Sequence, residues 1–302
     1  MLVLSVPWLL LFLLVIAVVF FLKKKWKLAS LLLLVIFAIN WWTSCFCFGF
    51  NNNFSGDIKV LSFNVNGQKE IGFNNTSSIV SLINKEEPDV IFLTENYKPL
   101  KDSLFMILSL KYPYNTRYLY HNMIYSKHPI SDLNYIERPY GGSAYITQCI
   151  VSIDGIELCL YGCHLSSNNY SKELEYLTPD EIDTVDKLKS YLINTKNSSF
   201  FRELEADTIV SSISERNYAI VMGDMNDICG SSCMLIFKNA GLKDAWSEGG
   251  FGYGATFHHP LPYRIDHIMY NDKLSLKGIK KIGTSGISDH DALVAVFDFD
   301  NN

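Results

Sequence analysis

The chain has 302 residues and a formal net charge of −5, so it is long enough for one large domain with a full hydrophobic core. Hydrophobic residues make up 48% of it, and 18 glycines and 9 prolines are too few for a disordered or collagen-like chain. Seven cysteines are too sparse for a disulfide-stapled miniprotein. The only charges before residue 51 are four lysines, so the remainder holds 22 basic residues against 31 acidic ones and carries −9.

Residues 1–50 form an apolar leader. Residues 1–22 are uncharged and could span the roughly 30 Å of a hydrocarbon core as a helix. The four lysines follow at positions 23–27, and a second uncharged stretch with two tryptophans near its end runs over residues 28–50. We expect a transmembrane hairpin of two helices. The alternatives are one span with an interfacial segment, and a cleaved signal peptide, which normally starts with positive charge.

The lysines predict the orientation of this hairpin. Lysines in a short loop favour the cytoplasmic side of a membrane. Both ends of the hairpin would then face outward. We therefore expect a multi-pass protein of the cytoplasmic (inner) membrane, anchored in the lipid bilayer through residues 1–50, with its domain outside the cytoplasm.

A polar linker at residues 51–57 precedes a domain that we expect at residues 58–302. Apolar runs separated by turn signals predict its elements. Nearly all are strands, with few helices, which favours sheets packed on one another and helices outside. We expect strands at residues 58–64, 89–94, 115–125, 217–222, 263–270 and 292–299, and helices at residues 76–85, 199–214 and 233–240.

Residues 145–153 and 156–164 flank Asp154-Gly155, which predicts a β-hairpin in which residue 149 faces residue 160. This register keeps the three cysteines of the hairpin from bonding, so we expect buried thiols there. Only Cys229 and Cys233 are spaced for a local bridge.

Residues 165–199 are polar and have no regular pattern of apolar residues, which predicts a long connection that is either a lid or a solvated loop. Six acids lie between residues 173 and 186. A lid of that sign would repel polyanions.

Polar residues gather where the predicted strands end. Any one of these residues by itself is explained without a catalytic role, because asparagine and aspartate are common turn formers. Asp266 is the exception, because it lies beside Ile265 and Ile268, and a buried carboxylate is costly unless it is paired or binds a metal. His290 is the partner that we expect for it.

Six motifs in chain order resemble the endonuclease/exonuclease/phosphatase superfamily, whose members include the pancreatic-type deoxyribonucleases. The resemblance covers about residues 59–299 and is strongest to membrane-tethered members typical of Bacteroidetes. It implies a four-layer α/β sandwich, with two packed mixed sheets flanked by helices. The motifs are SFNVNG (62–67), TEN (94–96), GCHL (162–165), GDMND (223–227), RIDH (264–267) and SDH (288–290).

The resemblance also implies a Mg²⁺ or Mn²⁺ ion held by Glu95, with Asn64 and Asp289 near it. Hard cations prefer such oxygen ligands. Among the same residues, Asn64 would also contact the substrate. No nucleophile elbow, phosphate-binding glycine loop or paired-cysteine zinc site competes with this interpretation.

The catalytic residues implied by the resemblance surround the phosphoryl group. Asp224 would orient or deprotonate the attacking water, and Asn226 would bind that water or the phosphate. His164 and His290 would donate to phosphoryl oxygens, and Asp266 would orient His290. Asp224 and His290 both remain candidates for the general base.

His164 is typical of the deoxyribonuclease, sphingomyelinase and inositol polyphosphate 5-phosphatase branches, whereas the apurinic endonucleases carry other residues near this point. The charge of −9 disfavours tight nonspecific binding of nucleic acid. We therefore expect a hydrolase of a small or lipid-linked phosphodiester or phosphomonoester. The alternatives are an extracytoplasmic nuclease and a non-catalytic tethered binding domain. The sequence leaves the oligomeric state open.

Overall fold

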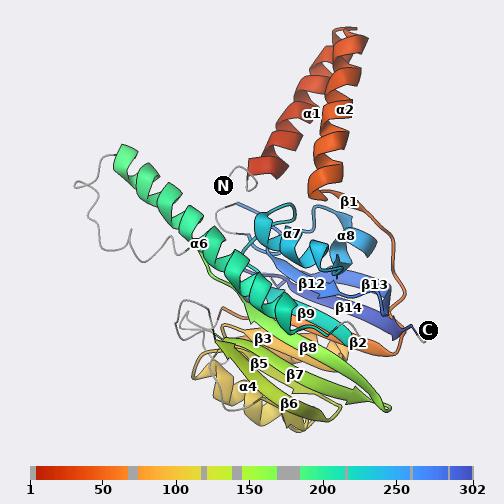
Figure 1. Cartoon of the computed structure of the whole chain (residues 1–302), viewed down its shortest axis with the longest axis vertical. Coiled ribbons are helices and arrows are strands. Elements are labelled where there is room, and N and C mark those ends of the chain that lie inside the picture. Colours follow the sequence, from red (N-terminus) through yellow and green to blue (C-terminus); the bar gives the residue numbers. More distant parts are fainter. Residues whose placement is uncertain are drawn as a thin grey trace.

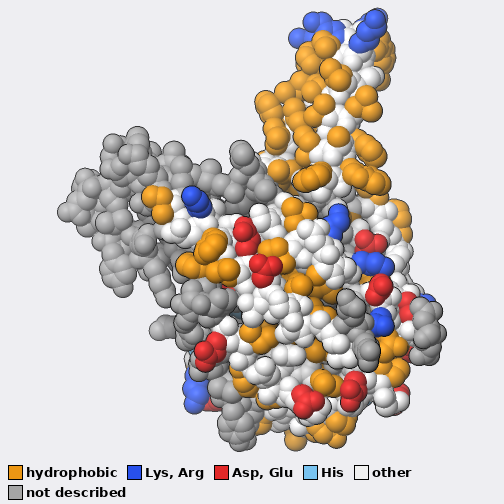
Figure 2. Space-filling model, viewed as in Figure 1, with side chains coloured by type: hydrophobic (Ala, Val, Ile, Leu, Met, Phe, Trp, Pro, Cys, Tyr) orange, Lys and Arg blue, Asp and Glu red, His pale blue; other side chains and the backbone are white. Residues whose placement is uncertain are grey.

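In the computed structural model, an apolar helical hairpin stands on a domain of two packed β-sheets (Figure 1). The structure describes residues 5–66, 74–116, 121–137, 145–168, 184–214, 217–258, 261–284 and 286–300. The hairpin consists of α1 (Val6–Leu22) and α2 (Trp26–Thr43). Its lysines lie at the tip farthest from the domain, and hydrophobic side chains cover its sides (Figure 2).

Among the described residues, α2 alone is long and apolar enough to cross a membrane. Its mean hydropathy is 1.5 and only 11% of it is buried. The helix α1 is uncharged and one residue shorter, with 17 residues, whereas α2 contains Lys27 in its first turn. Each helix would extend about 26 Å, close to the roughly 30 Å of a hydrocarbon core.

The first sheet is mixed and contains six strands. Strands β2 and β3 run parallel at its centre, and Asn64 pairs with Thr94 where both end. All other neighbours in this sheet are antiparallel. Its order is β13 (Leu274–Ile282), β14 (Ala292–Phe299), β2 (Ile58–Asn64), β3 (Val90–Thr94), β5 (Met123–Ser126) and β4 (Tyr114–Asn115).

The second sheet repeats this plan. Strands β8 and β9 are its parallel pair, and His164 pairs with Asp224 where both end. Strand β12 runs antiparallel to β9, which places Asp266 opposite Asp224. The order is β10 (Lys243–Asp244), β12 (Asp266–Tyr270), β9 (Tyr218–Asp224), β8 (Ile156–His164), β7 (Tyr145–Ile153) and β6 (Ile130–Glu137).

Three hydrophobic cores hold four layers together. The central core joins the inner faces of the two sheets, with Phe92 of β3 and Met222 of β9 among its members. A second core packs α3 (Asn74–Glu86) and α4 (Leu100–Leu108) on the first sheet. A third packs α6 (Thr184–Ser212) and α7 (Ser232–Asn239) on the second. The expected four-layer α/β sandwich is confirmed, because each sheet buries both of its faces.

The predicted β-hairpin is confirmed to the residue, with Cys149 opposite Leu160. The single strand expected at residues 115–125 is instead two short strands, β4 and β5. All seven cysteines are free, including Cys229 and Cys233, which therefore form no bridge.

The irregular connection expected up to residue 199 ends early, because α6 begins at Thr184. The stretch from 184 to 199 contains neither glycine nor proline, so nothing in it interrupts a helix. The acids at positions 173–183 lie outside the described residues.

Candidate active site

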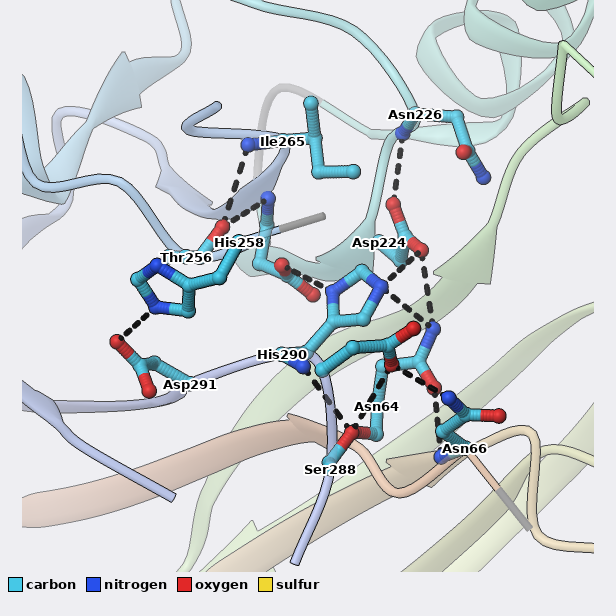
Figure 3. Close-up of polar contacts among 12 residues, drawn as sticks. Asn64, Asn66, Asp224, Asn226, Thr256, His258, Ile265, Ser288, His290 and Asp291 are labelled. Carbon is cyan, nitrogen blue, oxygen red and sulfur yellow. Dashed lines mark hydrogen bonds and ion pairs between the residues drawn. The ribbon is translucent and has the colours of Figure 1, made fainter. Parts of the chain in front are cut away.

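Polar side chains from both sheets meet at the edge where the two parallel strand pairs end. Asn64 ends β2, Glu95 follows β3, His164 ends β8 and Asp224 ends β9. The two sheets pack face to face, so these four ends converge even though the residues are up to 160 positions apart in the chain. Asn64 is central: its Nδ2 donates to Asp224 Oδ2 at 3.0 Å (Figure 3). The same Nδ2 donates to Glu95 Oε1 at 3.3 Å.

Glu95, His164 and Asp224 form a group that could hold a metal ion. Their ligand atoms all lie within 4.8 Å of one another. His164 Nε2 is 3.6 Å from Glu95 Oε1 and 3.7 Å from Asp224 Oδ2, and the side chains of His164 and Glu95 are partly exposed. Two carboxylates from separate strand ends suit a hard divalent cation. Glu95 also has a φ of +53°, a left-handed backbone conformation that is uncommon for a non-glycine residue.

His290 and Asp266 form a buried pair beside this group, as the sequence predicted. His290 Nδ1 lies 2.8 Å from Asp266 Oδ2, and the opposite ring nitrogen, Nε2, lies 3.8 Å from Asp224 Oδ2. Burial by itself would lower the pKa of His290, but the carboxylates of Asp266 and Asp224 outweigh it and raise this pKa to about 10. The ring of Phe257 packs on the imidazole at a centroid distance of 4.9 Å.

Asp266 is buried and only half satisfied. Its Oδ1 has no hydrogen-bond partner among the residues that the structure describes, although its main-chain N–H donates to Thr256 Oγ1 at 3.1 Å. A buried carboxylate oxygen without a donor favours the protonated form of a neighbouring imidazole, because the imidazolium supplies the missing positive charge.

Asp224 has an environment that weakens it as an acid. Burial, and next the charge of Asp266, raise the pKa of Asp224. Its Oδ1 accepts a hydrogen bond from the main-chain N–H of Asn226 at 2.9 Å. Asn226 Nδ2 in turn donates to Leu165 O at 3.0 Å, so this amide joins the loop after β9 to the end of β8.

Asp289 lies with Asn66 and outside the Glu95 group. Asn66 Nδ2 donates to Asp289 Oδ1 at 2.6 Å, and the main-chain N–H of Asn66 donates to Asn64 Oδ1 at 3.0 Å. Among the described residues, the ligand atoms gathered with Glu95 are those of His164 and Asp224. The structure thus brings the expected metal residues Asn64 and Glu95 into contact and joins Asp289 to them through Asn66.

Sequence reasoning missed three residues that shape the site. Ser288 Oγ donates to Asn64 O at 2.8 Å and accepts from the main-chain N–H of His290 at 3.1 Å, which ties two of the motifs together (Figure 3). Thr256 contacts Asp266 and Phe257 contacts His290, both from the glycine- and aromatic-rich segment at residues 249–259. The position of Ser288 two residues before His290 was the one available signal.

A buried ionic cluster lies behind the site. Arg264 Nη1 donates to Asp244 Oδ2, and His267 Nδ1 lies 3.2 Å from the same oxygen. Burial would raise the pKa of Asp244, but Arg264 and His267 hold it well below its usual range. Cys229 Sγ, Asp244 and His267 also satisfy the spacing of a metal site, yet Arg264 Nη2 lies 2.7 Å from that sulfur, so a guanidinium already supplies the positive charge. His267 Nε2 lies 3.0 Å from Asp227 O, which braces the loop after Asp224.

The chain matches a family model and several solved structures. The model described as "Endonuclease/Exonuclease/phosphatase family" matches residues 61–290. A D. rerio TDP2 structure complexed with a single-strand DNA product is 17% identical, with a TM-score of 0.60, covering 80% of this chain and 98% of that one. An endonuclease/exonuclease/phosphatase structure from Beutenbergia cavernae is 16% identical (TM-score 0.60; 81% and 72% covered). The SmcL structure is 15% identical (TM-score 0.59; 80% and 98% covered).

These identities are low, so the structural matches show the fold. A comparison with curated protein sequences finds no match.

Proposed function

The chain belongs to the endonuclease/exonuclease/phosphatase family, whose members are hydrolases of phosphoesters, and on this basis we propose that it is a divalent-metal-dependent phosphoesterase that uses an activated water molecule. The observation that carries the proposal is that two groups of polar side chains meet at the edge where the parallel strands of both sheets end. One is the Asp266–His290 pair, and the other is the Asn64–Glu95–Asp224 hydrogen-bonded set.

We assign the metal to Glu95 and Asn64, with Asp289 joined to them through Asn66. The carboxylates of Glu95 and Asp224 fit such an ion, because they gather with His164 within one small volume, and the Nδ2 of Asn64 contacts both carboxylates. When bound, Mg²⁺ or Mn²⁺ supplies positive charge that stabilises the phosphoryl oxygens in the transition state.

The described side chains account for the remaining chemistry. His290 is held at Nδ1 by Asp266, so Nε2 can donate to a phosphoryl oxygen or to the leaving oxygen. Asp224 lies between Asn64 and His290 and accepts the proton of the water, since a raised pKa makes a carboxylate a better base. His164 adds a second imidazole at the partly exposed rim. Asn226 fixes Asp224 through its main-chain N–H and contacts the water or the phosphate.

For the substrate we propose a small or lipid-linked phosphoester. The acidic domain disfavours polyanions, as its charge of −9 shows no excess of lysine and arginine. A nuclease is the second candidate, and the observation that favours it is the likeness to a fold that in the D. rerio protein holds a single-strand DNA product. A non-catalytic binding domain is the third.

We further propose that the hairpin anchors the domain to the inner membrane. The apolar helices α1 and α2 support the anchor. The lysines at the far tip of the hairpin favour the cytoplasmic side, which would put the domain on the opposite side of the membrane. The proposed organisation is a two-helix anchor at residues 1–50, a linker at 51–57 and the phosphoesterase domain at 58–302.

A substrate panel tests this function. The full chain in detergent is incubated with Mg²⁺ or Mn²⁺ and bis-p-nitrophenyl phosphate, sphingomyelin, inositol phosphates or plasmid DNA. The proposal predicts EDTA-sensitive hydrolysis of at least one ester of low charge, faster than cleavage of DNA. Faster cleavage of DNA would favour the nuclease, and hydrolysis of none of them would contradict the proposed activity and favour the binding domain.

A further inference from the structure

The hydrophobic surface of the hairpin continues onto the domain. No charged residue occurs between Lys27 and Asp57. At the end of α2, Trp41 and Trp42 are 77% and 67% exposed. The chain then follows the domain surface through a segment that we call the neck (residues 44–53), where Phe48 and Phe50 are also about 70% exposed.

A residue from a distant part of the chain completes this surface. Phe251 is exposed, and its ring lies 6.3 Å from that of Phe48 and 5.3 Å from that of Phe50. The contact arises because β1 (Cys47–Phe48) pairs with β11 (Phe251–Gly252), which follows α8 (Ala245–Gly249). Phe48, Phe50 and Phe251 are here called the aromatic patch.

The neck is fixed to the domain, so the patch keeps its place at the base of the hairpin. Gly49 N–H donates to Gly250 O at 2.8 Å, and Arg264 Nη2 donates to Ser44 O at 3.1 Å. Contact at Gly49 is so close that a Cβ atom there would lie 2.6 Å from the carbonyl carbon of Gly249. These contacts therefore hold the aromatic patch next to the C-terminal end of α2.

A groove of about 330 Å³ separates the end of α2 from the domain beside this patch. Trp41, Phe46 and Phe48 line it, and Lys238 of α7 is its one charged lining residue. Lys238 is exposed and makes no ion pair within the part of the chain that the structure describes. The adjoining cavity of about 130 Å³ is lined by Lys238 and Lys243 and by the carboxylates of Glu248 and Asp244, of which Asp244 is already paired with Arg264.

We propose that the aromatic patch and Lys238 form a surface that lies in the headgroup layer of a phospholipid bilayer, with a lipid phosphate beside Lys238 in the groove. Aromatic rings prefer this layer, and an ammonium group without a partner suits a phosphate. A second copy of the chain could also cover an aromatic patch. The bilayer is favoured because the patch continues the apolar surface of α2 and lies beside the ammonium group of Lys238, which has no ion pair among the described residues. This inference rests on the proposed anchoring of the hairpin.

Site-specific photocrosslinking tests the inference in the full chain. Benzoylphenylalanine replaces Phe48 or Phe251, and the protein is placed in vesicles of phosphatidylcholine and phosphatidylglycerol and irradiated. Phe37 on α2 is the reference for the anchor. Leu110, which is 88% exposed and follows α4 at the end of the domain away from the hairpin, is the matched control (Figure 1).

Lipid adducts at Phe48 and Phe251 should exceed those at Leu110 by about tenfold. Adducts at Phe37 with none at the patch would overturn the inference and leave the anchor intact. Adducts from the patch to a second protein chain would overturn it in favour of a dimer. Absence of lipid adducts at Phe37 as well would overturn the anchor and the inference together.

Lys238 is tested separately by native mass spectrometry of the detergent-released protein. Lys238→Glu should retain at least about threefold less phosphatidylglycerol than the wild type, because the cation beside the lipid phosphate is replaced by a negative charge. Lys196→Glu on the exposed side of α6 should retain as much as the wild type. Equal retention by all three proteins would refute the role of Lys238.

Discussion

Replacing Asp266 by asparagine isolates the charge of the carboxylate that holds His290. The amide keeps the shape of the side chain, and its oxygen can still accept the proton of Nδ1 across the 2.8 Å contact. Burial opposes a positive charge on His290, yet its pKa is raised to about 10, and Asp266 is the main cause of that rise. Against an ordinary value of about 6.5 the shift corresponds to about 5 kcal/mol.

The expected effect follows from the protonated fraction of His290. If loss of the Asp266 charge returns the pKa to about 6.5, about 3% of the imidazole is protonated at pH 8, whereas the wild type is almost fully protonated. With saturating Mg²⁺, kcat/KM for bis-p-nitrophenyl phosphate should therefore fall about 30-fold at pH 8. The loss should shrink as the pH is lowered toward 5.5, because the variant regains its proton.

The control is Asp291→Asn. It removes a buried carboxylate that follows His290 in sequence but contacts His258 and Lys281. It should leave the shape of the pH profile unchanged. If Asp266→Asn lowers kcat/KM by the same factor at every pH, the charge of Asp266 does not act through protonation of His290, and the reasoning is refuted.

Three further changes test other parts of the structure. Glu95→Gln should lower turnover at limiting Mg²⁺ by at least about 10²-fold, with partial recovery in excess Mn²⁺, since a metal ligand loses its charge; wild-type turnover at limiting Mg²⁺ would contradict the assignment. Arg264→Met leaves the Asp244 carboxylate buried without its guanidinium, so it should cost about 3 kcal/mol. Thermal unfolding should then show a Tm lower by roughly 6–12 °C, and a shift under about 2 °C would contradict this. Gly49→Ala should cost about 1–3 kcal/mol because its Cβ meets backbone, whereas Gly283→Ala, whose Cβ meets nothing within 4 Å, should be neutral; equal Tm values would show that the neck is loosely held.

The strands were predictable because their signals are local. Ile58–Asn64 is a short, mostly apolar run with two β-branched residues, and the alternation around Asp154-Gly155 set the hairpin register that the structure shows. The Asp266–His290 contact was also predictable, because a carboxylate in an apolar strand needs a partner.

Contacts between remote segments left no such signal. Nothing near Arg264 indicates that it binds Asp244 and the carbonyl of Ser44, because both contacts depend on how the sheets and the neck pack. The bond between Asn66 and Asp289 likewise joins residues 223 positions apart. The early start of α6 was missed for a different reason: polarity was taken as a sign of a loop, although an exposed helix can be as polar.

Hydrolysis of bis-p-nitrophenyl phosphate by the purified full chain, with and without EDTA and beside its Asp224→Asn variant, tests the phosphoesterase most directly. Asp224 contacts Asn64, His164 and His290, so it links the metal group to the Asp266–His290 pair. We predict release of p-nitrophenol that EDTA stops, that added Mg²⁺ or Mn²⁺ restores, and that Asp224→Asn lowers by about 10³-fold. Hydrolysis that continues in EDTA, or that Asp224→Asn leaves unchanged, would contradict the proposed function.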